Sequence, residues 1–433
     1  KFCMLNAKYF KGKRITIVGL ARSGVACANL LHSLGACVRV TDIKDNAQTR
    51  SSAALLLSED IQFELGAHSK SFIKQADLIV ISPGVSCDAQ PIIWAKDYAK
   101  PVYAEIEIAS MLCPSQIIAV TGSNGKTTVT TLIGKILKAS GKRVFVCGNI
   151  GNPFSGEVES MRRGDFVVLE VSSFQLEAIK DFKPKIAVII NLTPNHLDRY
   201  HDMQEYSAAK KRIFMNQDKN DFLILNALDP LLKKIAKEAS AKVNFFTQAP
   251  GLDPNQSAVF KVGEILGIAR QKMLDVFSQF KGIEHRLEEV AVVNGIKFIN
   301  DSKATTADST IWGLNSISSP VILIAGGKDK GIDYGVIVPA AKNKVKKVIL
   351  IGEAKDKIAA CLNADFLVEK VNGLEEAVNK AYASAQPGFS VLFSPMCSSF
   401  DMFTGYEERG RVFKQIVLDL VKKDNSHGPE NSD

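Results

Sequence analysis

Residues 119–128 read AVTGSNGKTT, and the fold of the chain can be worked out from this stretch. A phosphate-binding loop brings backbone N–H groups at the start of a helix together around phosphate oxygens. The G-K-T end (125–127) fits such a loop, although the general pattern has a glycine where this chain has Val120. An apolar run precedes the loop, and residues 126–140 read as a helix that ends before Gly141. This context favours a nucleotide site of variant form over a chance match.

Short apolar runs alternate with helical patterns along almost the whole chain. Continuous apolar runs with helices between them indicate parallel strands that are covered on both faces. The runs that read as strands are 14–20, 76–82, 117–122, 166–172, 186–191, 222–226, 321–327, 347–352 and 391–395. A chain of 433 residues exceeds one ordinary core. We therefore predict an α/β protein with a Rossmann-like N-terminal domain (1–104), a central P-loop domain with a parallel sheet (105–282) and a Rossmann-like C-terminal domain (283–433).

Composition limits the class of protein and its partners. The apolar and charged fractions, 46% and 23%, are ordinary for a soluble globular protein. The net charge of +8 suits an anionic small-molecule substrate, and we expect no nucleic-acid partner. Eight cysteines occur singly, without a C-x-x-C pair for zinc or a disulfide framework. No apolar run approaches the roughly eighteen residues of a membrane helix, and the first residues lack a signal-peptide core. We expect a cytoplasmic monomer without a membrane span.

Polar side chains follow the strand patterns that neighbour the loop. A P-loop requires an acid at the end of a neighbouring strand to hold its metal, and Glu170 directly follows four apolar residues. The segment NLTPNHLDRY (191–200) places His196 and Asp198 after another buried strand. Ligands of open α/β sheets bind at this carboxyl edge. A single histidine or strand-end glutamate is more often structural, but the neighbouring phosphate site favours a functional role for both.

The stretch GLARSG (19–24) resembles a dinucleotide fingerprint, but Ala21 replaces the second glycine. Asp42 follows at the distance expected for the acid that binds a ribose. SPG (82–84) ends another strand, as a sugar-nucleotide site would require. A redox dinucleotide site and a sugar-nucleotide site are therefore the two alternatives for the first block.

Five motifs together resemble the Mur ligases of peptidoglycan synthesis. In the order found in that family they are TGSNGKTT (121–128), GNIG (148–151), LEVSSFQLE (169–177), NLTPNHLDRYHDMQEYSAAK (191–210) and NDSKATTAD (300–308). The resemblance covers nearly the whole chain, is weakest at 240–280 and is strongest to the branch that adds D-glutamate. The loop of that family also lacks the first glycine, so Val120 agrees with the resemblance.

The resemblance implies ATP-dependent amide formation that adds D-glutamate to UDP-N-acetylmuramoyl-L-alanine. In that chemistry the substrate carboxylate attacks the γ-phosphate of ATP to give an acyl phosphate, and the amine of D-glutamate then displaces phosphate. The first domain would bind the UDP part, the second ATP and the third the amino acid. The implied cofactors are ATP, Mg²⁺ at two sites and an N-carbamate on Lys210.

The resemblance also implies a role for each matching position. The catalytic residues would be Lys126, Glu170, His196, Lys210 and Lys303. The metal ligands would be Thr127, Glu170, His196 and carbamylated Lys210. The ATP site would comprise Gly122, Ser123, Asn124, Gly125, Lys126, Thr127, Thr128, Arg286 and Asp301. The UDP-substrate site would comprise Arg22, Ser23, Asp42, Ser82, Gly84, Asn149, Ser172 and Tyr406. The D-glutamate site would comprise Thr305, Lys330, Ser399 and Phe400.

Two of these implied ligands require comment on chemical grounds. A lysine reacts with CO₂ only when it is deprotonated, so we expect a depressed pKa for Lys210. Taken alone, Lys210 reads as a surface helix residue, and the adjacent Lys211 shows how little the residue type reveals. Mg²⁺ prefers oxygen ligands, so direct ligation by His196 is a weaker expectation than ligation by Glu170.

The match weakens between FFTQ (245–248) and His285, where this chain is shorter than the family. Asn255 matches the first asparagine of the family's adenine-binding segment, but the second falls on Ala258. We predict that a hairpin is missing, that one helix covers 259–280, and that the lost contact weakens ATP binding by about 1 kcal/mol.

Two alternatives to the D-glutamate branch remain. A sister ligase, including the folylpolyglutamate branch, would use another acceptor, and NDSKAT (300–305) favours the D-glutamate branch over it. A non-catalytic nucleotide-binding relative would explain Ala258, but the retained lysines and metal ligands disfavour it.

Overall fold

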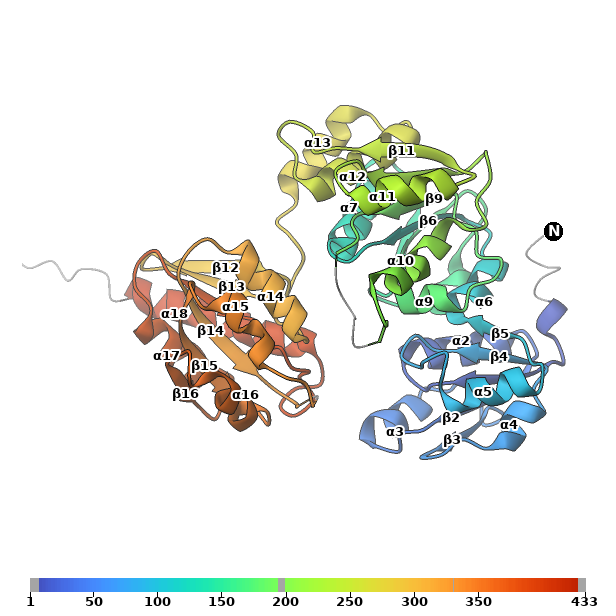
Figure 1. Cartoon of the computed structure of the whole chain (residues 1–433), viewed down its shortest axis with the longest axis horizontal. Helices are drawn as coiled ribbons and strands as arrows, with labels where there is room; N and C mark the ends of the chain where they lie inside the picture. The colour runs from blue at the N-terminus through green and yellow to red at the C-terminus, as the bar shows by residue number, and fades with distance from the viewer. Residues whose placement is uncertain (1–7, 194–198, 330, 427–433) are drawn as a thin grey trace, which may run out of the picture. The chain divides into compact units, whose positions relative to one another are not determined.

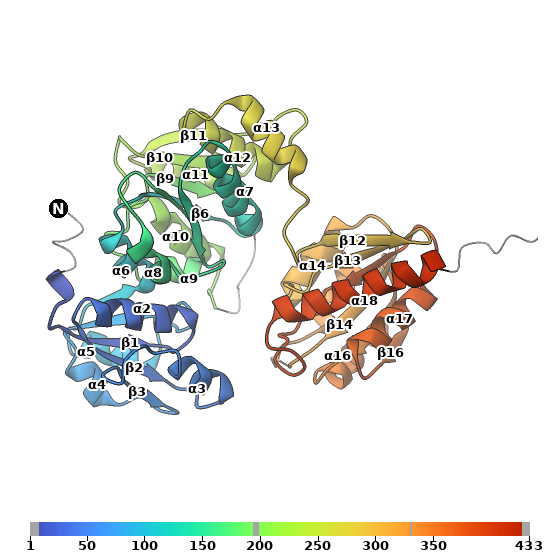
Figure 2. The same cartoon turned by 180° about the vertical axis from the view of Figure 1, so that it is seen from behind.

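The structure is a computed structural model that describes residues 8–193, 199–329 and 331–426. The predicted site residues His196, Asp198 and Lys330 lie outside the described residues. Contacts divide the chain into two compact units, Lys1–Phe280 and Lys281–Asp433. The first unit contains two sheets and the second contains one, so the predicted α/β class with three sheet-centred domains is confirmed (Figures 1 and 2).

The first sheet is parallel and has the strand order β3-β2-β1-β4-β5. Its strands are β1 (Arg14–Val18), β2 (Cys37–Asp42), β3 (Gln62–Leu65), β4 (Leu78–Ile81) and β5 (Val102–Ala104). One face packs on α2 (Arg22–Ser33), and the other packs on α4 (Lys70–Lys74) and α5 (Gln90–Asp97). The helix α3 (Ala47–Ala53) follows β2. The strand order proceeds outward in opposite directions from β1 and β4. Open α/β sheets bind ligands at such a switch point.

The second sheet has the parallel order β11-β10-β9-β6-β8-β7. Its strands are β6 (Gln116–Thr121), β7 (Val144–Gly148), β8 (Phe166–Glu170), β9 (Ile186–Ile189), β10 (Phe222–Asn226) and β11 (Lys242–Phe246). Alternate residues of these strands point to two separate apolar cores. One core packs on α7 (Lys126–Ala139), which is in front in Figure 2. The other packs on α6 (Glu105–Leu112), α8 (Phe154–Glu157), α9 (Ser173–Glu177) and α11 (Pro230–Ile235).

The end of the central region differs from the prediction of one helix over 259–280. The structure has two helices, α12 (Pro254–Ile265) and α13 (Arg270–Gln279). Asp253 begins α12 earlier than predicted, because its side chain accepts from the N–H of Gln256 in a capping box. Gly267 has φ +67° and follows the end of α12, a left-handed conformation that terminates helices. The chain passes from β11 to α12 without a strand between them, as the shortened sequence predicts.

Two buried glutamates at the start of α6 connect the first sheet to the second. Glu107 accepts hydrogen bonds of 2.8–3.0 Å from the backbone N–H groups of residues 180–182. Glu105 accepts from the N–H of Ser155 at 2.7 Å, and burial raises its pKa. Because α6 directly follows β5, these bonds hold the two sheets of the first unit together.

The second unit contains the order β12-β13-β17-β14-β15-β16. Its strands are β12 (Glu288–Val293), β13 (Ile296–Asn300), β14 (Val321–Gly326), β15 (Val345–Ile351), β16 (Val368–Lys370) and β17 (Ser390–Phe393). The sequence analysis missed β12, which is antiparallel to β13 across an Asn294-Gly295 turn. One core packs on α14 (Ala307–Ser316), α15 (Val338–Ala341) and α16 (Lys355–Leu362), and the other on α17 (Leu374–Ser384) and α18 (Tyr406–Ser426).

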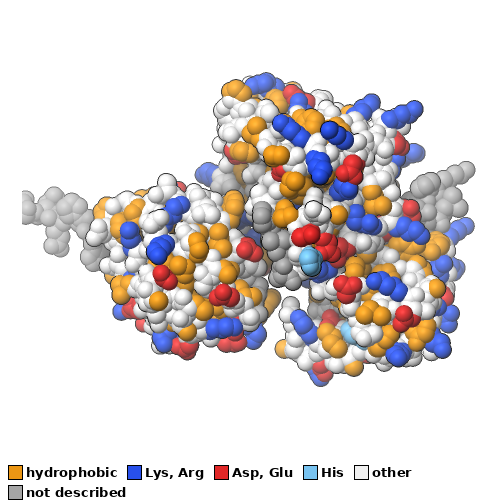
Figure 3. Space-filling view, viewed as in Figure 1, with side chains coloured by type: hydrophobic (Ala, Val, Ile, Leu, Met, Phe, Trp, Pro, Cys, Tyr) orange, Lys and Arg blue, Asp and Glu red, His pale blue; other side chains and the backbone are white. Residues whose placement is uncertain are grey.

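The surface carries a mixture of basic and acidic side chains, as is ordinary for a globular protein. On the face drawn in Figure 3, lysine and arginine side chains are interspersed with acidic ones. Among the described residues, no helix is long and apolar enough to cross a membrane.

Candidate active site

The phosphate loop lies between β6 and α7, as the sequence predicts. Gly125 immediately precedes α7 and has φ +82°, which glycine adopts without strain. The Lys126 ammonium lies 2.9 Å from the carbonyl oxygens of both Gly122 and Ser123. Thr127 is buried in the first turn of α7, beside the half-buried Thr128. The N–H groups at the start of a helix have no partners within it, so this end of α7 presents donors suited to a phosphate.

The loop is held in place by residues that follow β9, and the sequence analysis missed them. Asn191 accepts from the N–H of Asn124 at 2.9 Å and donates to its carbonyl at 3.2 Å. The Ser123 hydroxyl donates to the Thr193 carbonyl and accepts from the Thr193 N–H. Because Asn191 stands at the end of a strand pattern beside the loop, its position was a signal that could have revealed it.

Glu170 lies beside the loop at the carboxyl edge of the sheet. It ends β8 and pairs in register with Val120 of β6. Its side chain is 2% exposed, and one carboxylate oxygen accepts from the amide of Asn149 at 2.7 Å. The other oxygen, Oε2, is buried without a hydrogen-bond partner among the described residues. A buried carboxylate oxygen without a protein donor is suited to a bound cation.

Lys210 and Lys211 have opposite environments, although they are neighbours in α10 (Met203–Lys211). Lys210 is 2% exposed, and its ammonium donates to the Gly122 carbonyl at 3.0 Å and lies 4.7 Å from the ring centroid of Tyr206. Burial, and then the charge of Lys126, lowers the pKa of Lys210 well below its ordinary value. Lys211 forms a surface ion pair with Glu238. The predicted depression of the Lys210 pKa is therefore supported by its position.

Asn255 and Ala258, which match the family's adenine-binding segment, also have different environments. Asn255 lies in the first turn of α12, where a Cβ added to Gly125 would come within 2.3 Å of its Oδ1. Asn255 is therefore beside the phosphate loop. Ala258 is fully buried in the core that packs on α7, so this position makes no polar contact with a ligand.

Five of the residues assigned to the UDP part lie at the carboxyl ends of β1, β2 and β4, whereas Asn149 and Ser172 follow strands of the central sheet and Tyr406 begins α18 in the second unit. The Asp42 carboxylate accepts from the N–H groups of Leu20 and Lys44. Ser82 is buried and donates to the Gly19 carbonyl, whereas Gly84 is exposed. Arg22 and Ser23 begin α2 at the same edge. These five residues therefore share one edge, but Ser82 already has a backbone partner.

One contact of a residue assigned to the UDP part connects this edge to the central sheet. Arg22 donates to the Gly151 carbonyl at 2.8 Å, which ties the GNIG segment to the start of α2. The side-chain amide of Asn149, from the same segment, donates a hydrogen bond to Glu170. Ser172 caps α9 through a bond from the Gln175 N–H. Its hydroxyl therefore has a structural partner in addition to any substrate contact.

In the second unit, Asp301 is buried and directly follows β13. It accepts from the Leu287 N–H at 3.2 Å and from the Ser394 hydroxyl at 2.9 Å. Burial raises the pKa of Asp301 to about 7. Arg286, the other residue assigned to ATP in this unit, has its guanidinium 5.5 Å from the ring centroid of Trp312.

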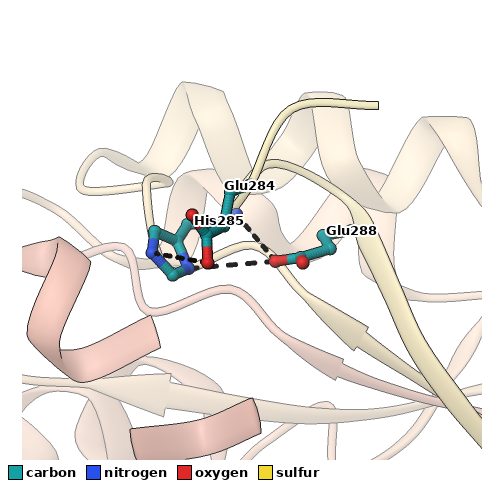
Figure 4. A group of neighbouring side chains, drawn as sticks. All are labelled: Glu284, His285 and Glu288. Atoms are coloured by element: carbon teal, nitrogen blue, oxygen red, sulfur yellow. Dashed lines mark hydrogen bonds and ion pairs between the residues drawn. The ribbon is translucent and has the colours of Figure 1, made fainter. Parts of the chain in front are cut away.

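His285 lies close to Glu284 and Glu288, and Figure 4 shows this cluster of three side chains, which are of types that can bind a metal ion. The Lys414 ammonium lies 2.6 Å from Glu288 and 3.0 Å from Glu284, so it already supplies a positive charge there. His285 is 3% exposed, and its Nδ1 lies 3.0 Å from the amide nitrogen of Asn300. Burial lowers the pKa of His285. We interpret the cluster as structural support for the adjacent Arg286.

The residues assigned to the amino acid and the phosphate gather at the carboxyl ends of β13 and β17. The Lys303 ammonium lies 5.9 Å from the ring centroid of Tyr406, at the start of α18. Thr305 follows in the same loop, with its N–H on the Lys303 carbonyl. After β17, Ser399 is 2% exposed and Phe400 is 53% exposed. Ser399 is therefore less accessible to a ligand than Phe400 in this arrangement.

Arg409 is a buried residue of the second unit that the sequence analysis missed. Its guanidinium donates to the Ser302 carbonyl at 2.9 Å and to the Cys397 carbonyl at 3.1 Å. Burial lowers its pKa to about 10. It joins the loop that carries Lys303 to the loop that carries Ser399. A single arginine in a helical pattern gave no sign of this role.

Three family models match the chain. The model described as "Mur ligase MurD-like, N-terminal domain" matches residues 13–104. "Mur ligase middle domain" matches residues 120–288, and "Mur ligase, glutamate ligase domain" matches residues 285–397.

Individual proteins match over nearly the whole length. A UDP-N-acetylmuramoylalanine--D-glutamate ligase from Koribacter versatilis is 41% identical over 451 residues, which cover 96% of this chain and 99% of the relative. A protein of the same name from Geotalea uraniireducens is 41% identical, with coverages of 94% and 98%.

Solved structures share the fold at lower identity. The UDP-N-acetylmuramate-alanine ligase of Thermotoga maritima superposes with a TM-score of 0.57 at 20% identity, over 94% of this chain and 99% of that one. The MurF ligase of Thermotoga maritima in complex with ADP gives 0.55 at 14% identity, with coverages of 97% and 96%.

Proposed function

This chain belongs to the Mur ligase family, and from that premise we propose that it adds D-glutamate to UDP-N-acetylmuramoyl-L-alanine in peptidoglycan precursor synthesis. Membership makes it an ATP-dependent ligase that forms ADP. Relatives with that activity in their names are 41% identical over nearly the full length of both chains. One observation of the structure supports the proposal most directly. The carboxylate oxygen of Glu170 that has no hydrogen-bond partner among the described residues and the buried Lys210 both lie beside the phosphate loop.

The chemistry requires an inert carboxylate to become an acyl donor. Phosphorylation by ATP achieves this, and the amine of D-glutamate then forms the amide while phosphate leaves. The N–H groups at the start of α7 and the Lys126 ammonium would hold phosphate oxygens as negative charge develops. Lys303 in the second unit would contribute a further positive charge toward the substrate carboxylate and phosphate.

The residues around the loop also fit magnesium. Glu170 offers a buried oxygen with no protein donor, and Thr127 offers a hydroxyl at the first turn of α7. Mg²⁺ neutralises phosphate charge when it is bound at such a site. We retain His196 as a proposed ligand, and two Mg²⁺ sites as part of the proposal.

Lys210 is the proposed site of an N-carbamate. Its amine is desolvated, and its lowered pKa favours the neutral form that reacts with CO₂. The product is an anion, which the charge of Lys126 would attract and which would supply oxygen ligands. The neighbouring Thr121 hydroxyl lies 3.4 Å from the Lys210 nitrogen, so the group has a polar contact at hand.

The proposal also assigns one substrate to each domain. Residues 1–104 would bind the UDP part, 105–282 ATP, and 283–433 the amino acid, with Tyr406 toward the nucleotide substrate. Thr305, Lys330, Ser399 and Phe400 would receive D-glutamate. We propose a cytoplasmic monomer.

The test is phosphate release from ATP and Mg²⁺ with UDP-N-acetylmuramoyl-L-alanine. D-Glu, L-Glu, L-Ala, D-Ala-D-Ala and L-Lys are added separately as acceptors. We expect release with D-Glu alone. Release with another acceptor would assign a sister activity, and no release from folded protein would favour a non-catalytic relative.

A further inference from the structure

Arg199 and Tyr200 are both bound to Glu177, the last residue of α9. Arg199 Nη2 donates to Glu177 Oε2 at 2.9 Å, and the Tyr200 hydroxyl donates to Glu177 Oε1 at 2.5 Å. The side chains of Glu177 and Arg199 are only 17% and 20% exposed. One carboxylate therefore holds two consecutive residues, and we call these three residues the Glu177 clamp.

The clamp also reaches the first sheet. Arg199 Nη2 donates to the Val85 carbonyl at 3.3 Å. Val85 directly follows the SPG turn (82–84), which carries residues assigned to the UDP part. The Arg199 guanidinium lies 4.0 Å from the ring centroid of Phe174, which limits its movement. The same nitrogen thus connects the nucleotide-sugar edge of the first sheet to α9 of the central sheet.

A chain of aromatic contacts leads from the clamp to the phosphate loop. The Tyr200 and Tyr206 rings are 5.4 Å apart between centroids. The Tyr206 hydroxyl donates to Ser123 of the loop at 3.2 Å, and the Lys210 ammonium lies over the Tyr206 ring. Displacement of Tyr200 would therefore reach both the loop and Lys210 through packed side chains.

A cavity of about 690 Å³ lies on the side of α10 that carries Glu205 and Ala208. Ser86, Cys87 and Asp88, which lie between β4 and α5, line it together with the clamp. The clamp bonds therefore lie at the edge of this cavity, and on the other side Tyr200 packs against Phe174 and Tyr206.

We propose that Glu177 is a positioning residue that holds Arg199 and Tyr200 and couples the UDP-substrate edge to the phosphate loop and Lys210. The inference rests on the proposed function, because the loop and Lys210 belong to the proposed ATP and metal site. Glu177 itself has no role in the chemistry. Its loss would instead weaken metal and nucleotide-sugar binding together, and it would leave the amino-acid site in the second unit unchanged.

The informative variants change one bond set at a time. Glu177→Gln keeps the size of the side chain and removes the charge that holds Arg199. Tyr200→Phe removes only the hydroxyl bond. Glu238→Gln is the matched control, because Glu238 lines the same cavity but pairs with Lys211, outside the clamp.

The measurements separate positioning from loss of folded protein. For each variant, the activation constant for Mg²⁺ and the KM values for UDP-N-acetylmuramoyl-L-alanine and D-glutamate are determined, with hydrogen exchange of residues 199–206. For Glu177→Gln we expect the first two constants to rise about tenfold, as for lost support of a metal ligand. Tyr200→Phe should raise them about fivefold, the effect of one hydrogen bond. The KM for D-glutamate and every constant of Glu238→Gln should stay within about twofold of the unmodified protein.

Several outcomes would overturn the proposal. Unchanged Mg²⁺ and nucleotide-sugar constants in Glu177→Gln would do so, and so would an equal rise in the KM for D-glutamate. If the unmodified protein has no activity, the proposed function fails separately. The clamp is then judged by hydrogen exchange and by calorimetric binding of Mn²⁺ in the presence of ATP. Faster exchange at 199–206 with weaker Mn²⁺ binding in Glu177→Gln would support it, and unchanged values would refute it.

Discussion

At the residue scale, burial determines what chemistry a side chain can perform. Lys210 and Lys211 are identical in type and adjacent in α10, yet one is buried against the phosphate loop and the other pairs with Glu238 at the surface. Asp301 is similar, because its enclosed position raises its pKa to about 7. In both cases the desolvated charged form is disfavoured, and this effect leads to measurable predictions.

If Lys210 carries an N-carbamate, activity should depend on CO₂. This dependence should require Lys210 and not its neighbour Lys211. Unmodified enzyme depleted of CO₂ should lose activity and regain it after addition of bicarbonate. Because burial lowers the Lys210 pKa, the rate of recovery should rise with pH and level off well below 10.5. Lys210→Gln should lose on the order of 100-fold in kcat, as for a lost metal-site group, and should not respond to bicarbonate. Lys211→Gln is the control, and a bicarbonate response of Lys210→Gln would contradict the proposal.

The raised pKa of Asp301 predicts a loss of stability as pH rises. Between pH 3.8 and about 7 the folded carboxyl retains a proton that the unfolded chain releases. Each pH unit in this window should therefore lower the free energy of unfolding by about 1.4 kcal/mol. Asp301→Asn should remove this part of the slope when Trp312 fluorescence is followed in denaturant from pH 5 to 7. The exposed neighbour variant Asp308→Asn should keep it, and a slope that persists in Asp301→Asn would disprove the assignment.

At the element scale, capping residues decide where helices meet the site. Asp253 begins α12 so that Asn255 reaches Gly125, and Gly267 ends the helix before α13. The early start of α12 places one amide beside the phosphate loop, although Ala258 is buried in the core. The shortened central region therefore keeps one polar side chain on the nucleotide side.

This arrangement predicts a specific effect of Asn255→Ala on ATP binding. Loss of one hydrogen bond is worth about 1 kcal/mol, so the KM for ATP should rise about fivefold while kcat changes little. Steady-state kinetics at saturating concentrations of the other substrates provides the measurement. Asn244→Ala, on the edge strand β11, is the control. An unchanged KM for ATP in Asn255→Ala would show that this amide does not contact the nucleotide.

At the scale of the whole molecule, the chain divides into two compact units with separate cores. The sequence contains two tryptophans, and each unit has one, Trp94 in α5 and Trp312 in α14. Each can therefore report the unfolding of its own unit when the other is replaced by phenylalanine.

We predict that Mg²⁺ and ATP stabilise the first unit more than the second. A ligand at 100 times its dissociation constant adds about 2.7 kcal/mol to the state that binds it. In Trp312→Phe, where Trp94 reports, the denaturant midpoint should rise on addition of Mg²⁺ and ATP. In Trp94→Phe the Trp312 signal should shift less. Equal shifts in the two variants would show that the units unfold as one, or that the second unit contributes equally to the nucleotide site.

Local pattern was sufficient for the phosphate loop and for the continuously apolar strands, whereas β3, β5, β7, β11 and β16 were not among the predicted strands. Strand runs such as 117–122 and 166–172 are apolar because both faces of a parallel sheet are buried, and that requirement is visible in the sequence. The G-K-T end of the loop and Glu170 after its strand are equally local signals. The antiparallel β12 was missed, since its run begins with two glutamates and only one of its apolar residues, Val293, is buried.

Tertiary structure alone decided the burial and partners of side chains far apart in the chain. Glu177 holds Arg199 and Tyr200 across 22 and 23 residues, and Arg409 reaches Ser302 across 107. Such contacts follow from how sheets and loops come together, and no periodicity or spacing records them. The lowered pKa of Lys210 has the same origin, because desolvation depends on the atoms that surround a group and not on its neighbours in sequence.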